Sequence, residues 1–203
     1  MTPEEMHEAI RAELIARSEP WKLPVMQRFF KEPIDAYCTY TLHVRNLAKT
    51  HGAEFATWRD QERTALTKAL WASGKFEEGS MAIQLFARMR RKCGECEWRL
   101  FSRWLDRHIH NWAHCDALCA DVLGQMLIAE PARIGEMFEW VQASPLYKRR
   151  AAVVAPLKGI RKGLFREEGQ RLAAQLATDR ADILKKAVKW IRVELKGRKT
   201  VSC

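Results

Sequence analysis

The chain has 203 residues, of which 47% are hydrophobic and 30% are charged, and its net charge is +10 at pH 7. This composition is typical of a globular protein and excludes a disordered chain. No apolar run reaches the ~18 residues that a membrane-spanning helix needs, and the acidic stretch MTPEEMHEAI is not a signal peptide. We therefore expect a cytoplasmic protein with reduced cysteines, whose positive charge favours nucleic acid or an anionic membrane surface as partner.

Helical patterns follow one another along the chain, and no segment has the alternation of a strand. Thr2 and Pro3, followed by two glutamates, open the first helix. Gly52, Gly74 and Gly94 are expected to end or separate later helices. The expected helices cover roughly residues 2–17, 25–30, 41–52, 54–73, 76–91, 95–107, 111–127, 131–140, 144–159, 167–177 and 182–197.

Successive helices form pairs that recur at roughly 35–40 residues, which is the period of HEAT-type repeats. Each pair has an apolar face too wide to stand alone, so stacked pairs are favoured. We expect an all-α fold, an α-solenoid of HEAT-like helical repeats with a basic concave surface, as one domain over residues 1–203. A compact helical bundle is the alternative.

The stretch NWAHCDALCADVLGQML, residues 111–127, carries a polar group at the margin of an apolar stripe. At about 100° per residue, Asp116 lies about 40° from Trp112, on the rim of that stripe. A carboxylate one turn from a tryptophan on such a helix is either an ordinary surface-edge aspartate or part of a site.

Basic residues are clustered in the second half of the chain, around positions 148–150, 158–162 and 185–196, with a further cluster at 88–92. Cations near helix C-termini are often only solvated and favourable to the helix dipole. Several such clusters together would bind phosphates in a salt-dependent manner. We expect DNA contacts from Lys148, Arg149, Arg150, Lys186 and Lys189.

Several stretches in the same order resemble the AlkD-like DNA alkylation repair family. They are RFFKEPIDAY with VRNLAK, LWASGKFEEGSMAIQLF, NWAHCD with its Trp-x-x-x-Asp spacing, YKRRAAV and KKAVKW, from about Gln27 to Leu195. The family has HEAT-like helical repeats, in agreement with the periodicity above. Tyr147, Lys189 and Cys38 depart from it, standing where the family has Trp, a small residue and Gly.

The resemblance implies a DNA glycosylase that excises N3- and N7-alkylated purines from double-stranded DNA in base excision repair, without flipping the base into a pocket. It implies catalytic roles for Asp116, Trp112 and Trp190, and a phosphate contact for Arg150. Asp116 should then face a groove between Trp112 and Trp190. We expect a monomer in the cytosol or nucleoid that uses no cofactor.

Two other functions stay open. The basic clusters alone fit a non-catalytic DNA-binding HEAT module that recognises unusual DNA structure, and a neutral or acidic concave face would fit a protein-binding scaffold. A carboxylate at the site suits the glycosylase reaction. An alkylated purine is a cationic leaving group, and a nearby carboxylate stabilises the positive charge that grows on the deoxyribose.

Cysteine spacing offers a separate hypothesis, because Cys93 and Cys96 followed by Cys115 and Cys119 superficially resemble a four-thiolate zinc site. The second pair has i,i+4 helical spacing and falls within an apolar stripe, where cysteine acts as a small hydrophobe. We therefore expect no metal. His108, His110 and His114 are expected at the surface or facing DNA.

Overall fold

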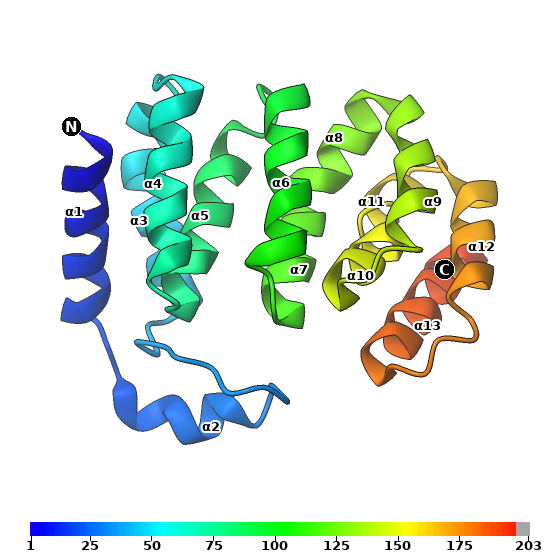
Figure 1. Ribbon diagram of the computed structural model, residues 1–203, viewed down its shortest axis with the longest axis horizontal. Coiled ribbons are helices and arrows are strands. Elements are labelled where there is room, and N and C mark those ends of the chain that lie inside the picture. Colours follow the sequence, from blue (N-terminus) through cyan, green and yellow to red (C-terminus); the bar gives the residue numbers. More distant parts are fainter. Residues whose placement is uncertain (198–203) are drawn as a thin grey trace, which may run out of the picture. The chain divides into compact units, whose positions relative to one another are not determined.

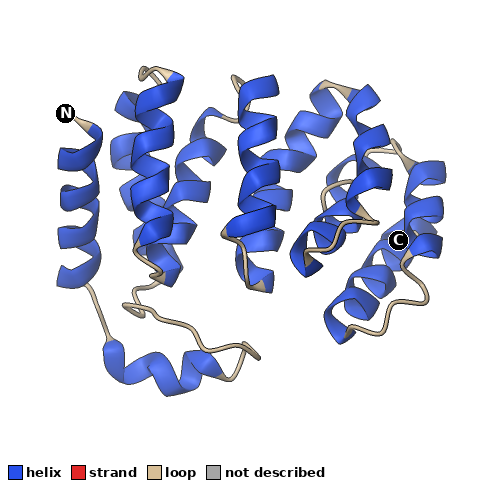
Figure 2. Cartoon of the chain, viewed as in Figure 1, coloured by secondary structure: helices blue, strands red, loops and turns tan. Residues whose placement is uncertain are grey.

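A computed structural model describes residues 1–197 of the chain, and within them the structure is helical, with a single isolated β-bridge between Asp35 and Lys75 and no strand (Figure 2). The all-α prediction is confirmed. The contacts divide the chain into two compact units, residues 1–92 and residues from 93 onward. No helix in the described part is long and apolar enough to cross a membrane.

The first unit contains five α-helices and one short 3₁₀ helix (Figure 1). Helix α5 packs against α3 and α4, and α1 packs against the same two helices. The elements are α1 (Pro3–Ala16), a 3₁₀ turn (Pro20–Lys22), α2 (Leu23–Gln27), α3 (Thr41–Phe55), α4 (Asp60–Ala72) and α5 (Phe76–Met89).

Gly52 does not end a helix, as the sequence suggested, but lies inside α3, where it is buried. A Cβ at this position would lie 3.0 Å from Cγ of Arg88 on α5, so the glycine permits the close approach of α3 and α5. Helix α3 therefore continues to Phe55, and the next helix begins at Asp60 rather than near Glu54.

Cys38, where the related family has glycine, adopts a φ of 61° in the segment between α2 and α3. This left-handed conformation favours glycine, because a Cβ crowds the neighbouring carbonyl oxygen. The side chain of Cys38 is nevertheless buried, and burial raises the pKa of its thiol.

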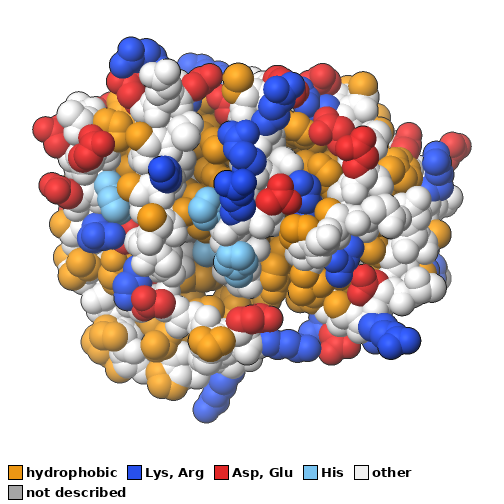
Figure 3. Space-filling model, viewed as in Figure 1, with side chains coloured by type: hydrophobic (Ala, Val, Ile, Leu, Met, Phe, Trp, Pro, Cys, Tyr) orange, Lys and Arg blue, Asp and Glu red, His pale blue; other side chains and the backbone are white. Residues whose placement is uncertain are grey.

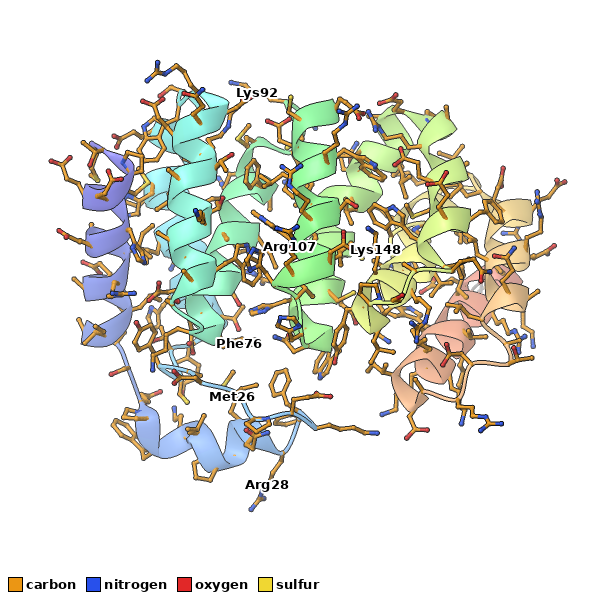
Figure 4. The ribbon with its side chains drawn as sticks, in the orientation of Figure 1. Met26, Arg28, Phe76, Lys92, Arg107 and Lys148 are labelled. Carbon is orange, nitrogen blue, oxygen red and sulfur yellow. The ribbon has the colours of Figure 1, made fainter. Side chains whose placement is uncertain are left out.

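The segment around α2 exposes apolar side chains, and Figure 3 shows hydrophobic groups gathered at the surface over it. Trp21, Val25 and Phe29 are 70%, 56% and 68% exposed. Arg28 projects away from the helices of this unit (Figure 4). The segment is attached to α5 through Phe30, whose ring contacts Phe76 edge-on at 5.5 Å.

Two buried glutamates at the start of α5 hold the first unit together. Glu77 accepts hydrogen bonds from the backbone N–H groups of Tyr37 and Thr39 at 2.9 and 3.1 Å. Burial raises its pKa, although those hydrogen bonds oppose the effect. The segment before α3 is thus tied to α5 through polar groups in the interior.

Glu78 is fully buried and pairs with three side chains: His7 Nε2 at 2.7 Å, Arg11 Nε at 3.2 Å and Tyr37 Oη at 2.7 Å. Burial alone would raise the pKa of Glu78. Hydrogen bonds from His7, Tyr37 and Arg11 outweigh burial and lower it.

The second unit contains α6 (Glu95–Arg107), α7 (Trp112–Leu118), a π-helical turn (Cys119–Leu123), α8 (Gly124–Ala129), a 3₁₀ helix (Pro131–Glu136), α9 (Met137–Trp140), α10 (Leu146–Val154), α11 (Leu157–Ile160), α12 (Arg166–Gln175) and α13 (Asp182–Lys196). Helix α10 is central: it packs against α6, α7, α9, α12 and α13. The predicted helix over residues 144–159 is interrupted before Pro156, which lacks an N–H to continue it.

The expected helix at 111–127 is one continuous helical segment from Trp112 to Ala129, but its middle turn, Cys119–Leu123, is π-helical. A Cβ on Gly124, the next residue, would lie 3.0 Å from the carbonyl oxygen of Ala155. Glycine therefore allows close contact with the backbone between α10 and α11.

We predict that Glu78→Gln lowers the free energy of unfolding by about 2–3 kcal/mol at pH 7, because it removes the charged acceptor of a buried hydrogen-bond cluster. The folded-state pKa of Glu78 lies below the ordinary 4.5. The stabilisation that the Glu78 carboxylate provides is therefore present above pH 4.5, and it is lost as the pH falls through the pKa of the folded state. Urea unfolding at several pH values should show the difference from wild type narrowing in acid.

The matched control is Glu13→Gln on α1, where the carboxylate is about half exposed. This variant should change stability little at any pH. The role assigned to the cluster would be contradicted if Glu78→Gln lowered the free energy of unfolding as little as Glu13→Gln does. It would also be contradicted if the loss of stability caused by Glu78→Gln grew as the pH fell.

Candidate active site

Asn111 fixes the start of α7, one turn before Asp116. Its side-chain Oδ1 accepts the backbone N–H of His114 at 2.8 Å, and its amide nitrogen lies 2.9 Å from His114 Nδ1. His114 is only 5% exposed, so the expectation that it lies at the surface is wrong. Asn111 thus provides hydrogen-bond partners for the backbone N–H and the ring nitrogen of His114, which burial separates from water.

Asp116 and Arg150, 34 residues apart in the sequence, form a two-pronged ion pair. Nε of Arg150 lies 2.7 Å from Oδ1 of Asp116 and Nη2 lies 2.8 Å from Oδ2. The third guanidinium nitrogen, Nη1, donates to the carbonyl oxygen of Ile183 at 2.5 Å. One side chain on α10 thereby joins α7 to α13.

The two partners of this pair differ in exposure: the side chain of Arg150 is 6% exposed and that of Asp116 is 18% exposed. Burial would lower the pKa of Arg150, but the hydrogen bond to Asp116 and its charge raise it. Arg150 thus stays charged on the inner side of the pair, and the carboxylate is partly open to solvent.

Two cysteine thiols lie buried on the same helical segment. Cys115 is fully buried and its Sγ donates to the carbonyl oxygen of Tyr147 at 3.3 Å. Burial raises the pKa of the Cys119 thiol well above its ordinary value, and the neighbouring Cys115 and Asp116 add to the shift. Cys119 therefore stays a neutral thiol, and both cysteines pack in the interior.

Trp112 and Trp190 lie on two of the helices that this pair joins. Trp112 lies one turn before Asp116 on α7 and is partly exposed. Trp190 lies seven residues, about two turns, after Ile183 on α13. The bond from Arg150 to the Ile183 carbonyl holds the first turn of the helix that carries Trp190.

The indole of Trp190 is held by two further residues. Its Nε1 donates to Oε1 of Glu194 at 3.2 Å, and the same oxygen lies 2.6 Å from Nη2 of Arg161. The guanidinium of Arg161 also lies 5.9 Å from the centre of the Trp190 ring. Glu194 could have been suspected from its i,i+4 spacing to Trp190, whereas no sequence signal connected Arg161 to it.

The basic residues expected at DNA fall into two groups. Those at the start of α10 have partners within the protein: Lys148 Nζ lies 2.9 Å from both carboxylate oxygens of Asp106 on α6 (Figure 4), and Arg149 donates to the carbonyl oxygens of Ala143 and Ser144. Arg149 Nε also lies 3.3 Å from Asp179. Lys186 and Lys189 on α13 are exposed.

The surroundings of Arg150 do not fit the phosphate contact that was expected of it. A guanidinium that is almost fully buried and uses its three nitrogens within the protein is not placed to contact a DNA backbone. From the sequence, the tripeptide KRR at residues 148–150 is expected at the surface, because charged residues are seldom buried. The structure instead places Arg150 in the interior, where it orients Asp116.

The four cysteines of the zinc hypothesis occupy different environments: Cys93 and Cys96 lie partly or fully exposed at the start of α6, whereas Cys115 and Cys119 are buried. Within residues 1–197 no group of three or more His, Cys, Asp or Glu side chains is arranged to hold a metal ion.

A family model described as DNA alkylation repair enzyme matches residues 10–195. No curated protein matches the sequence. Among solved structures, the chain is similar to a "predicted DNA alkylation repair enzyme from Enterococcus faecalis", with 16% identity and a TM-score of 0.79 over 89% of this chain and 84% of that one. The likeness establishes an all-α helical-repeat fold.

We predict that Arg150→Lys lowers the free energy of unfolding by about 2–3 kcal/mol, because an ammonium group cannot make both prongs of the bond to Asp116 and also reach Ile183. Thermal or urea unfolding would measure the loss. Arg180→Lys, at an exposed position in the same unit, serves as control and should cost nothing measurable. Equal stabilities of the two variants would argue against the anchoring role.

A second prediction concerns the contact between Glu194 and Trp190. Glu194→Ala should shift the Trp190 indole N–H resonance in a two-dimensional ¹H–¹⁵N spectrum, because the indole loses its acceptor and Arg161 loses its ion-pair partner. The Trp98 indole, which donates to Glu136 at 2.6 Å, should stay in place. An unmoved Trp190 signal, assigned with Trp190→Phe, would rule out the contact.

Proposed function

Since the chain belongs to the DNA alkylation repair enzyme family, we propose that it is a DNA glycosylase, which hydrolyses the N-glycosidic bond of N3- and N7-alkylated purines in double-stranded DNA. One observation carries the proposal: a carboxylate, Asp116, is held by two hydrogen bonds from a buried arginine while it remains partly accessible to solvent.

The chemistry requires little acid catalysis, because an alkylated purine is already cationic and leaves as a neutral base. As the bond breaks, positive charge grows on the deoxyribose. A fixed carboxylate stabilises that charge and can orient the water that attacks the sugar carbon. We assign this role to Asp116.

Arg150 acts in this proposal as a positioning residue. It lies on the buried side of Asp116, so a sugar that approaches from solvent meets the carboxylate first and is farther from the guanidinium. Because Coulomb energy falls with distance, attraction to the carboxylate outweighs repulsion from the arginine. The two-pronged bond also prevents the carboxylate from rotating away from the sugar.

Trp112 and Trp190 are assigned to the edges of the sugar-binding site, where aromatic faces attract a sugar that becomes cationic. Glu194 and Arg161 fix the orientation of Trp190. We propose that the damaged base stays stacked in the duplex, as the family resemblance implies, since Asp116 lies on the outer side of a helix where a backbone sugar can reach it.

The remaining parts of the proposal follow from charge and family. Duplex DNA is the partner, and exposed lysines such as Lys186 supply phosphate contacts. The enzyme works as a monomer in the bacterial cytosol or nucleoid and needs no cofactor, because the reaction is a hydrolysis in which a base that is already cationic leaves as a neutral molecule. A DNA-binding module with HEAT-like repeats but no catalysis is the second candidate, favoured by the exposed α13 lysines, which require no chemistry.

The test is to incubate the protein with methylated duplex DNA and measure free 7-methylguanine and 3-methyladenine. We expect release by the wild type. Asp116→Asn, which keeps the size of the side chain, should lower the rate by about 10²–10³-fold, the effect of removing one preorganised electrostatic group. Binding to the same duplex should change much less.

Asp182→Asn is the matched control, because it makes the same chemical change at a carboxylate that is 62% exposed on α13. It should release bases at the wild-type rate. Tight binding by the wild type without release would instead support the non-catalytic module, and unchanged release by Asp116→Asn would refute the role of this residue.

A further inference from the structure

A groove lies between the C-terminal end of α12 and one flank of α13, with a volume of about 370 Å³. It is independent of the proposed active site, since neither Trp190 nor Arg150 lines it. Its eight lining residues are Leu176, Ala177, Lys185, Val188, Lys189, Arg192, Val193 and Lys196.

Helix α13 thus presents two different flanks. Ile183, Trp190 and Glu194 lie within about 40° of one another on the flank that faces the proposed site. Lys185 and Arg192 point about 140–160° away from Trp190, toward the groove. Lys189, expected from the sequence to bind DNA, lines this groove as well.

The groove is strongly cationic. Four of its eight lining residues are lysine or arginine and none is acidic. Of the nearby carboxylates, Asp182 lies 3.7 Å from Lys185, and Glu194 is on the opposite flank, bound to Arg161 and Trp190. An occupant must therefore carry negative charge.

The floor between these cations is apolar. Leu176 and Val188 are 3% and 5% exposed, and Val193, at the edge, is 57% exposed. A duplex backbone offers phosphates but no apolar surface to cover the exposed side chain of Val193. The complementary ligand is both acidic and apolar.

The spacing of the cations indicates the shape of that ligand. They stand at positions 185, 189, 192 and 196, a 4-3-4 pattern that forms one stripe along the helix for about 16 Å. Acidic residues with the same spacing on another helix would face them, with its apolar residues over the groove.

We propose that this groove is a docking site for an acidic amphipathic helix of a partner protein. The site binds by its apolar floor and is selective for negative charge through its four cations. It leaves the Trp190 flank of α13 free, so docking and DNA binding can occur on the same molecule.

The test uses a fluorescein-labelled 15-residue helical peptide with four glutamates in 4-3-4 spacing and leucines on the adjacent flank. Its binding to the full chain is followed by anisotropy. We expect saturable binding in the micromolar range, on the order of 10 µM. The same peptide with lysine in place of each glutamate should not bind.

Matched variants on α13 separate the two flanks. Arg192→Glu and Val193→Asp, in the groove, should each weaken peptide binding at least tenfold and lower the affinity for duplex DNA by no more than Lys186→Glu does. The control, Lys186→Glu, makes the same charge change as Arg192→Glu on the other flank and should not weaken peptide binding beyond a general charge effect. Melting curves confirm that all three variants fold.

The proposal would be overturned if the peptide did not bind saturably, or if Arg192→Glu and Lys186→Glu weakened peptide binding equally. It would also be overturned if duplex DNA displaced the peptide and Arg192→Glu lost more DNA affinity than Lys186→Glu. The last result would make the groove a phosphate-binding surface. The peptide measurement needs no DNA repair activity, so it stands or fails separately from the glycosylase proposal.

Discussion

Burial of the Arg150 guanidinium is the constraint on which the second unit depends. A buried charge is tolerated only when it is paired and its donors are satisfied, and here Asp116 supplies two acceptor oxygens while Ile183 supplies a third. The requirement fixes α7, α10 and α13 relative to one another. The position of Asp116 is therefore set by the interior of the unit rather than by a flexible surface, which is what a preorganised carboxylate needs.

Much of the fold follows from local sequence rules, and the exceptions have physical causes. Helix α6 begins where Gly94 and its acidic first turn predict. Gly52 was misread as a helix end, because only tertiary structure reveals that Arg88 packs on it. The close approach of Gly124 to the backbone at Ala155 is likewise a tertiary contact that local propensity does not encode.

The family resemblance selected Asp116 and Arg150 for one site, and the structure brings them into contact. The phosphate contact expected of Arg150 came from the same resemblance and from the basic cluster in which it stands. Its burial can be learned only from the fold. For Trp190, helical spacing could have indicated Glu194, whereas Arg161 reaches it from the end of α11, which follows no local rule.

The most direct test of the account is the affinity of the protein for a duplex containing a cationic pyrrolidine in place of one deoxyribose, a mimic of the charged sugar in the transition state. If Asp116 is a fixed carboxylate that stabilises this charge, the wild type should bind this duplex at least about 10²-fold more tightly than the uncharged duplex. Asp116→Asn should remove the preference. Equal affinity of the wild type for both duplexes would contradict the account.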